Sequence, residues 1–354
     1  MRRYWYRRIL IMILIFTIAV GGSYYFIEAS EYFMNQEVSA ATSDKTMVIP
    51  GGMPVGIYLE TDGVMVLGTD EVESIDGTMC EPAKHLVKAG DYIQKIDGEK
   101  VSSKEELVEA VAQLNQQEVI LQVERNGEEI QIKLEAIECK KDEYKLGIWV
   151  RDNAQGLGTI TYLTTESKFG ALGHGIHDVD TSKLLKISKG RVYATSIKDI
   201  KKGEYGIPGG MEGIIIYNNY NILGTIEKNT EAGIFGKIDR IDTLFTDQTP
   251  VEIALKEEVE EGAAIIRCAV EGKVKEYKIE IKKIDIDAKE INKGILLEIT
   301  DKELLKVTGG IVQGMSGSPI IQDGKLVGAV THVLVNSPDT GYSIFIENML
   351  DASE

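Results

Sequence analysis

The sequence of 354 residues predicts a mainly β protein that is preceded by one membrane-spanning helix. Residues 9–27 contain no charged side chain, which is typical of a helix in lipid. From Val48 onward the chain changes to short alternating apolar runs separated by glycines, which is typical of strands. Little helical periodicity is found after Glu143, and the length favours two folded domains over one.

The N-terminal end has the features of a signal-anchor. Residues 1–8 include four arginines, and the uncharged run that follows is long enough to cross a hydrocarbon core of roughly 30 Å. Positive charge before such a helix stays in the cytoplasm, so residues 1–27 are expected to anchor the chain and the rest to be exported. A cleavable signal peptide is the alternative, but its apolar region is usually about 7–15 residues long and no small-residue cleavage site is evident. Residues 28–47 are polar and are predicted to form a tether.

Composition limits the partners. The formal net charge of −17 argues against nucleic acid, because phosphate binding needs a basic face. Cys80, Cys139 and Cys268 are far apart and have no metal-ligand spacing, so they are interpreted as thiols, although one pair could bridge in an oxidising compartment. We expect neither a metal nor another cofactor.

Residues 48–138 predict a small α+β domain. Apolar runs come before a Gly90-Asp91 turn, and Ser102-Ser103 with Glu105-Glu106 caps a helix that continues to about Leu114. Two alternating runs then flank Asn126-Gly127, a strong hairpin signal.

This order of strands, turn, helix and hairpin resembles a PDZ domain of the bacterial arrangement. In that family a loop offers its backbone amides to the C-terminal carboxylate of a peptide, and the peptide adds to the domain as a strand. The residues that match this loop are Pro54, Val55, Gly56 and Ile57. Peptide C-termini or internal segments are therefore expected partners; the alternative is a domain that only packs on its neighbour.

Residues 145–350 predict a second β domain, built from glycine-punctuated barrel strands. Within it, Gly314-Met315-Ser316-Gly317-Ser318-Pro319 precedes a strand, an Asp-Gly turn and another strand. Such a turn suits a nucleophilic Ser316, with the amides of Gly314 and Ser316 stabilising an oxyanion. The alternative is a glycine-rich β-turn that happens to contain two serines.

A serine nucleophile needs a base, and histidine is the usual one. His174, which glycines flank, is the best candidate among the four histidines. His85 lies in the PDZ-like region, and His177 and His332 are interpreted as structural. His174, His177, Asp178 and Asp180 are all metal-ligand types, but the segment lacks a helical pattern and an outside ligand, so no metal site is predicted.

The serine turn and its hairpin are similar to those of chymotrypsin-like serine peptidases, which implies a double β-barrel. Phe-Gly-Ala-Leu-Gly-His at residues 169–174 and Gly-Met-Ser-Gly-Ser-Pro at 314–319, combined with an anchor and a PDZ domain before the peptidase, make the resemblance more specific. Nearly the whole chain resembles the stage IV sporulation protein B (SpoIVB) peptidase family. HtrA-type proteases share these parts but place the PDZ domain after the peptidase.

The resemblance implies a serine endopeptidase of the forespore inner membrane, exported into the space between the two forespore membranes. There it would cut a membrane-embedded regulator and so trigger activation of the late mother-cell sigma factor. Family members also cleave themselves under the control of the PDZ domain, and the tether is the expected place of that cleavage here.

The acid of the catalytic triad is carried over by resemblance alone. It is Asp301, and Thr331 matches a position that supports this acid in the family. An Asp followed by a Lys is more often a helix cap or a solvated turn residue. Asp199, Asp239 and Asp242 therefore remain candidates from their order in the chain.

Two other functions compete with this one. The first is a membrane-tethered PDZ scaffold that binds without cutting, although the presence of both serine and histidine in their motifs argues against it. The second is an HtrA-like quality-control protease, which would digest unfolded casein broadly, whereas a regulatory enzyme would cut one or two defined bonds.

Overall fold

A computed structural model describes residues 46–246 and 248–354. The predicted anchor and all but the last two residues of the predicted tether lie outside the described residues. Within the described ranges, no helix has both the length and the apolar character needed to cross a membrane.

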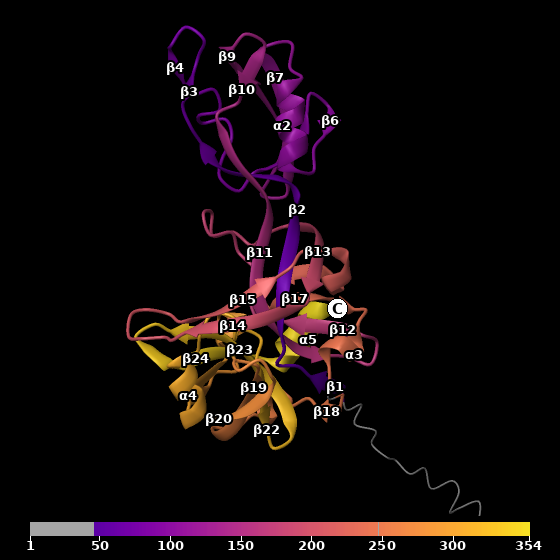
Figure 1. The fold of residues 1–354 in the computed structure, drawn as a ribbon, viewed down its shortest axis with the longest axis vertical. Helices are drawn as coiled ribbons and strands as arrows, with labels where there is room; N and C mark the ends of the chain where they lie inside the picture. The colour runs from indigo at the N-terminus through magenta and orange to yellow at the C-terminus, as the bar shows by residue number, and fades with distance from the viewer. Residues whose placement is uncertain (1–45, 247) are drawn as a thin grey trace, which may run out of the picture. The chain divides into compact units, whose positions relative to one another are not determined.

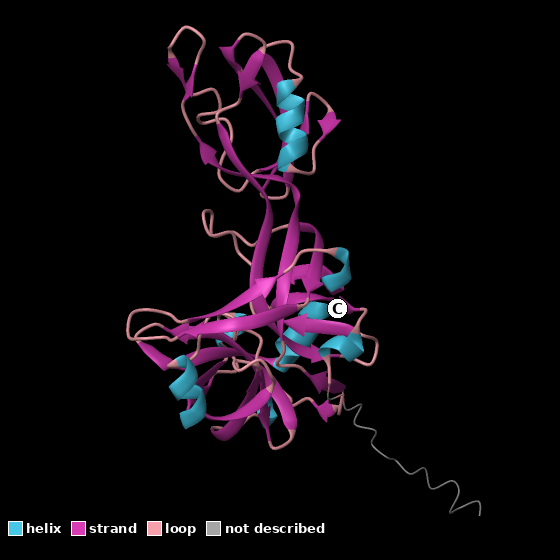
Figure 2. Cartoon of the chain, in the orientation of Figure 1, coloured by secondary structure: helices cyan, strands magenta, loops and turns pink. Residues whose placement is uncertain are grey.

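The described chain is mainly β, as the sequence predicts (Figures 1 and 2). Six strands form what we call the first barrel: β2 pairs with β11 on one side and with β13 on the other, which closes the ring. In order around the ring they are β2 (Pro54–Thr69), β11 (Ile148–Leu163), β12 (Lys168–Ala171), β17 (Gly233–Ile238), β16 (Ile222–Thr230) and β13 (Ile187–Tyr193).

A second barrel also closes with six antiparallel strands. Its strands, in order, are β19 (Gly262–Cys268), β20 (Lys275–Ile284), β21 (Ile295–Ile299), β24 (Ser337–Phe345), β23 (Lys325–Leu334) and β22 (Pro319–Gln322). Alternate residues of these strands point inward, and Ile279, Leu297 and Val330 are almost fully buried there. The two barrels agree with the predicted double-barrel fold.

The smaller domain uses the outer half of β2. Its other elements are β5 (Tyr92–Ile96), β6 (Glu99–Lys100), α2 (Lys104–Ala112), β7 (Glu118–Arg125) and β8 (Glu128–Glu135). The predicted helix cap is confirmed, because the Ser103 side chain accepts a hydrogen bond from the Glu106 amide. The predicted hairpin is confirmed as well: Asn126 and Gly127 both have positive φ, as a two-residue hairpin turn requires.

The remaining elements are short or lie beside the barrels. They are β1 (Met47–Pro50), β3 (Val72–Glu73), β4 (Met79–Cys80), β9 (Ile137–Lys140), β10 (Glu143–Lys145), β14 (Thr195–Lys201), β15 (Gly210–Ile215), β18 (Val251–Glu252), α3 (Ile241–Leu244), α4 (Lys302–Thr308) and α5 (Ile346–Ser353), with 3₁₀ turns η1 (Asn219–Asn221), η2 (Lys256–Glu258) and η3 (Ile291–Lys293).

The predicted carboxylate-binding loop is wrong. Pro54, Val55, Gly56 and Ile57 form the start of β2 inside the first barrel. Gly56 lies opposite Leu157 of β11 and Tyr193 of β13, so both edges of the strand are already paired. At Gly56 and Ile57 the backbone is engaged in both ladders and cannot receive a peptide carboxylate, and Pro54 has no amide hydrogen to offer. A side chain at Gly56 would also collide with Ile215, because its Cβ would lie 2.6 Å from the Ile215 Cγ2.

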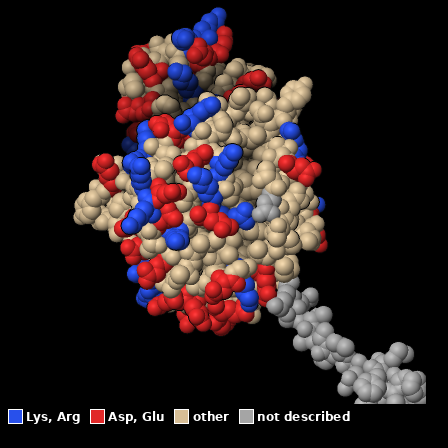
Figure 3. Space-filling model, turned by 60° about the horizontal axis from the view of Figure 1, so that its bottom comes forward, with Lys and Arg blue, Asp and Glu red and all other residues tan. Residues whose placement is uncertain are grey.

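The surface carries both signs of charge. On the face drawn in Figure 3, lysines and arginines are interspersed with aspartates and glutamates, and the described atoms of that face show no continuous basic stripe.

Candidate active site

Ser316 lies on a tight turn directly before β22. The turn is closed by a hydrogen bond from the Ser318 amide to the Met315 carbonyl, 2.9 Å long, and Gly317 in its third position has φ +93°. A turn of this kind needs positive φ there, which glycine adopts without strain. A Cβ on Gly317 would lie 2.1 Å from the Thr159 carbonyl oxygen, so only glycine fits.

The two amides predicted for the oxyanion hole are free. The neighbouring amides of Met315, Gly317 and Ser318 all donate to backbone carbonyls. Among the described residues, the N–H groups of Gly314 and Ser316 have no protein acceptor. Unpaired amides on either side of a nucleophile are the donors that an oxyanion requires.

The hydroxyl of Ser316 is held away from a base in this structure. Its Oγ donates to the Thr331 carbonyl over 3.0 Å. The Thr331 Oγ1 in turn lies 2.7 Å from the Asn292 carbonyl and 3.0 Å from that of Tyr342, which fixes this part of β23. A rotation about the Ser316 side-chain bond is therefore part of any attack on a carbonyl.

His174 follows β12 of the first barrel at a distorted piece of backbone. Leu172 and Gly173 before it both have left-handed φ, +71° and +70°, and such φ is uncommon for leucine. A Cβ on Gly173 would lie 2.9 Å from the Thr331 Cγ2 and from the Ile344 Cγ2. The histidine segment of the first barrel thus packs directly on the second barrel, next to the serine turn.

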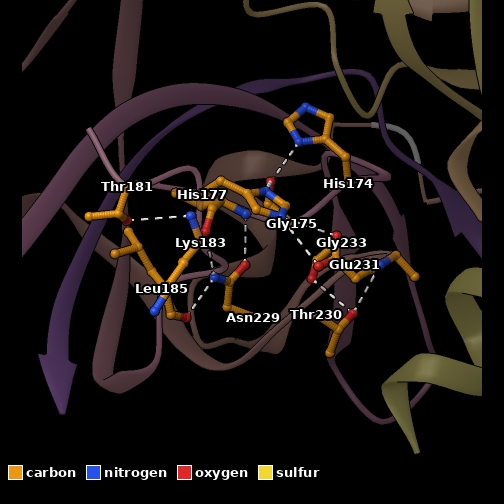
Figure 4. Close-up of polar contacts among 12 residues, drawn as sticks. His174, Gly175, His177, Thr181, Lys183, Leu185, Asn229, Thr230, Glu231 and Gly233 are labelled. Carbon is orange, nitrogen blue, oxygen red and sulfur yellow. Dashed lines mark hydrogen bonds and ion pairs between the residues drawn. The ribbon is translucent and has the colours of Figure 1, made fainter. Parts of the chain in front are cut away.

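A backbone carbonyl orients the imidazole of His174 (Figure 4). The Nδ1 of His174 lies 2.9 Å from the Gly175 carbonyl oxygen. A carbonyl only accepts hydrogen bonds, so Nδ1 carries the proton and Nε2 keeps its lone pair. Burial lowers the pKa of His174 below its ordinary value, the Gly175 carbonyl opposes this shift, and repulsion from His177 adds to it. The neutral, basic form is therefore favoured.

Side chains fix the segment after His174, which we call the histidine loop (residues 174–187). The Asn229 Oδ1 accepts from the Ile176 amide, and its Nδ2 donates to the carbonyls of Ile176 and Leu185, all over 2.9 Å (Figure 4). Asp178 is buried and forms an ion pair with Arg151 of β11, which also pairs with Asp180. Two of the carboxylates considered as metal ligands are thus engaged with an arginine.

The serine and the histidine line one cavity of about 420 Å³. Its walls come from both barrels: β11 supplies Ala154–Leu157, the histidine loop supplies residues 174–177, and the serine turn supplies Gln313, Gly314 and Ser316. Four consecutive residues of a strand line a cavity only if an edge of that strand faces it, because successive side chains point to opposite faces.

Asp301 is not brought to the histidine, and the structure contradicts its predicted role. Its Oδ1 accepts from the amides of Glu303 and Leu304, so it caps α4. Ile295 at the start of β21 is opposite Ser343, which is itself opposite Val330 beside the serine turn. Asp301 is six residues beyond Ile295, past the other end of the strand, which puts it roughly 20 Å along the strand from that point.

The predicted supporting residue, Thr331, and two of the alternative candidates for the triad acid, Asp199 and Asp242, also make other contacts. Thr331 contacts Ser316 through its carbonyl and bonds backbone carbonyls through its hydroxyl, so it does not support Asp301. The carboxylate of Asp199 accepts from the next backbone amide, that of Ile200. Asp242 lies in the first turn of α3, where its carboxylate accepts from Gln248.

Two residues near His174 were not predicted from the sequence. Glu231, in the turn between β16 and β17, lies 3.2 Å from the Nε2 of His177 (Figure 4). His332 of β23 has its ring centroid 5.4 Å from that of His174, and its buried Nδ1 has no partner among the described residues. Burial, followed by repulsion from His174, lowers the pKa of His332 to about 4. A turn glutamate and a strand histidine carry no local sequence signal.

Two closed barrels that contribute a histidine and a serine to one cavity define a serine peptidase of the double-barrel type. The family model of the SpoIVB peptidase S55 matches residues 142–350, and that of the PDZ domain matches residues 58–136. The chain belongs to the SpoIVB peptidase family and is a serine peptidase with a PDZ domain.

Similar solved structures include an active form of the Rv3671c protease from M. tuberculosis, at 13% identity over 57% of this chain and 73% of that one, with a TM-score of 0.30. Another is human heparin binding protein, at 12% identity over 55% of this chain and 82% of that one, with a TM-score of 0.29. Because these TM-scores are low, the fold is assigned from the strand pairings described above and not from these similarities. No curated protein is significantly similar in sequence.

Proposed function

We propose that this chain is a self-cleaving serine endopeptidase of sporulation signalling. It acts from the forespore inner membrane, in the space between the two forespore membranes, and cuts a membrane-embedded regulator so that the late mother-cell sigma factor is activated. The family match supports this proposal, together with the uncharged run at residues 9–27, which suits an N-terminal anchor. The PDZ domain supports protein substrates.

One observation carries the chemistry: Ser316 and His174 line the same cavity, and the amides of Gly314 and Ser316 have no acceptor among the described residues. Ser316 leaves the Thr331 carbonyl and gives its proton to Nε2 of His174 while Oγ attacks a peptide carbonyl. The two free amides receive the negative oxygen, and a donor of this kind is worth about 10²–10³ in rate. His174 then protonates the leaving amine. A water molecule next gives a proton to His174 and attacks the acyl-enzyme, and His174 returns that proton to the Oγ of Ser316 as the carboxylic acid product leaves.

The test is expression of the full chain beside Ser316→Ala, with the products followed on gels and by N-terminal sequencing. The parent is expected to trim itself within residues 28–47, and the variant to remain intact. Identical trimming of both chains would assign the cut to a host protease and refute self-cleavage. Broad digestion of casein by the parent but not by the variant would instead favour the HtrA-like quality-control protease.

A further inference from the structure

The two amides of the proposed oxyanion hole are oriented by different parts of the chain. The tight turn that carries Ser316 is closed by the bond from the Ser318 amide to the Met315 carbonyl, and this bond also fixes the peptide group that ends in the Ser316 amide. Gly314 lies one residue before this turn. Its amide belongs to the peptide group that starts at the Gln313 carbonyl, so another contact must fix its direction.

A hairpin that follows β13 of the first barrel makes this contact. The Gln313 carbonyl accepts from the Met211 amide over 2.8 Å, and the Gln313 amide donates to the Gly209 carbonyl over 2.9 Å. Met211 lies in β15, which pairs with β14 and comes between β13 and β16 in the chain (Figure 1). The Gly203 amide, in the loop of this hairpin, donates to the carbonyl of Thr308 at the end of α4 over 2.8 Å. The β14–β15 hairpin therefore bonds to the segment that leads into the serine turn.

The bond from Met211 sets the direction in which the Gly314 amide points. In a trans peptide group the C=O and the following N–H point in opposite directions, and the peptide bonds of the described residues are trans. Because the Gln313 oxygen is held toward β15, the Gly314 N–H points away from β15, and Gly314 lines the cavity of Ser316 and His174. Without this bond the peptide group is free to rotate, and its carbonyl oxygen can then take the place that the oxyanion needs.

Gly314 is also packed between two elements that lie outside the second barrel. A Cβ on Gly314 would lie 2.6 Å from the Cε of Met211 and 3.2 Å from its Cβ, so the hairpin is in direct contact with this glycine. From β11 of the first barrel, the Oγ1 of Thr159 donates to the Gly314 carbonyl over 2.7 Å. The Met211 side chain in turn packs on the core of the second barrel. The position of Gly314 thus depends on β15 and β11 as well as on its own loop.

We propose that Met211 is a positioning residue of the peptidase reaction: its backbone N–H orients the Gly314 amide toward the oxyanion, so that the β14–β15 hairpin completes the oxyanion hole. The inference rests on the proposed chemistry of Ser316 and His174, and it adds a group that does not touch the substrate. Negative charge on the carbonyl oxygen develops only as Ser316 attacks. Loss of the Met211 bond therefore lowers kcat and leaves KM unchanged.

Met211→Pro removes the donor. The Met211 amide donates to Gln313 and not to β14, so proline leaves the β14–β15 ladder paired, and Gly210 before it adopts the backbone conformations that a following proline allows. The full-length variant is assayed on a synthetic peptide of residues 28–50. Its kcat is expected to fall at least about tenfold, within the factor of about 10²–10³ that one oxyanion donor contributes, with KM within about twofold of the parent. Met211→Leu keeps the amide and should restore most of kcat.

Gly209→Ala weakens the same contact without a proline. A Cβ on Gly209 would lie 2.4 Å from the Gly203 nitrogen and 2.4 Å from the Lys201 oxygen, so the hairpin must shift relative to Gln313. Gly210→Ala is the matched control, because its Cβ would come no closer than 3.8 Å to an atom beyond its chain neighbours. The kcat should fall in Gly209→Ala and equal that of the parent in Gly210→Ala.

A peptide aldehyde distinguishes positioning from a purely structural role. In its complex the Oγ of Ser316 bonds to the aldehyde carbon, the serine proton passes to His174, and the negative oxygen accepts from the two amides. Its inhibition constant should rise in Met211→Pro by about the factor by which kcat falls. A parent-like kcat in Met211→Pro, or in Gly209→Ala if the proline variant does not fold, would overturn the proposal, and so would a change in KM alone. A parent that cuts neither the peptide nor itself would instead refute the proposed peptidase function.

Discussion

The serine turn and the histidine loop reach the same cavity but are fixed by different means. Around Ser316, short-range backbone bonds and glycines define the geometry, and two amides remain free for the substrate. Around His174, the orienting groups are a backbone carbonyl and side chains from distant strands, and the carboxylate of Glu231 is paired with His177. The geometry of the serine turn is therefore determined by residues close together in the sequence, whereas that of the histidine loop depends on contacts between residues far apart in the sequence.

The largest effect is expected when a side chain is added to the serine turn, because the geometry there depends on glycine. Gly317→Ala is expected to lower kcat/KM at least about 10²-fold, since the new Cβ would meet the Thr159 carbonyl and displace Ser316. The free energy of unfolding should fall by about 2 kcal/mol or more. Peptide hydrolysis and thermal unfolding measure the two effects.

Gly324→Ala is the matched control for that variant. Gly324 also has positive φ, +79°, but a Cβ there would meet nothing within 4 Å. It should cost only about 1 kcal/mol and leave the rate unchanged. Equal effects of the two substitutions would show that the positive φ matters and the crowding at Gly317 does not.

The pH dependence of activity reports on the histidine loop. His174 acts as a base only when neutral, and burial, its first cause, lowers its pKa below the ordinary 6.5. Activity is therefore kept as the pH falls from 7 to 6.5 and is lost below that, by about tenfold per pH unit once His174 is protonated. The logarithm of kcat/KM against pH gives the midpoint. A midpoint above 6.5 would mean that a carboxylate stabilises the imidazolium.

His177→Gln should raise the pH at which kcat/KM falls to half of its maximum on the acidic side, and this effect is expected to be smaller than that of Gly317→Ala. The substitution removes the repulsion that lowers the pKa of His174, and it frees the Gly175 carbonyl from the Nδ1 of His177, 3.2 Å away. Both changes favour protonated His174, so activity at acidic pH should fall while activity at pH 8 stays the same. Glu231→Gln is the control, because it keeps both histidines. An acid limb that moves downward in His177→Gln would contradict this electrostatic account.

Most of the fold and half of the site could be predicted from the sequence, because both depend on local patterns. Strand alternation, the Asn126-Gly127 hairpin and the Ser103 cap carry their signals within a few residues, and so does the serine turn. The loop at Pro54–Ile57 could not be assigned correctly, because the same residues suit a glycine-bearing loop and a strand. Its partners in β11 and β13 are about 100 residues or more further along the chain. Glu231 and His332 likewise become neighbours of the site only through barrel closure.

The smallest effect on rate is expected at Asp301, where resemblance and structure disagree most. Asp301→Asn keeps a side chain that caps a helix about as well as Asp does, so α4 and the free energy of unfolding should be preserved while the negative charge is lost. If Asp301 only caps α4, kcat/KM stays within about twofold of the parent. Removing the acid of a working triad instead lowers kcat by about 10⁴. Such a loss, with unchanged thermal unfolding, would show that β21 and α4 rearrange to bring Asp301 to His174 during catalysis.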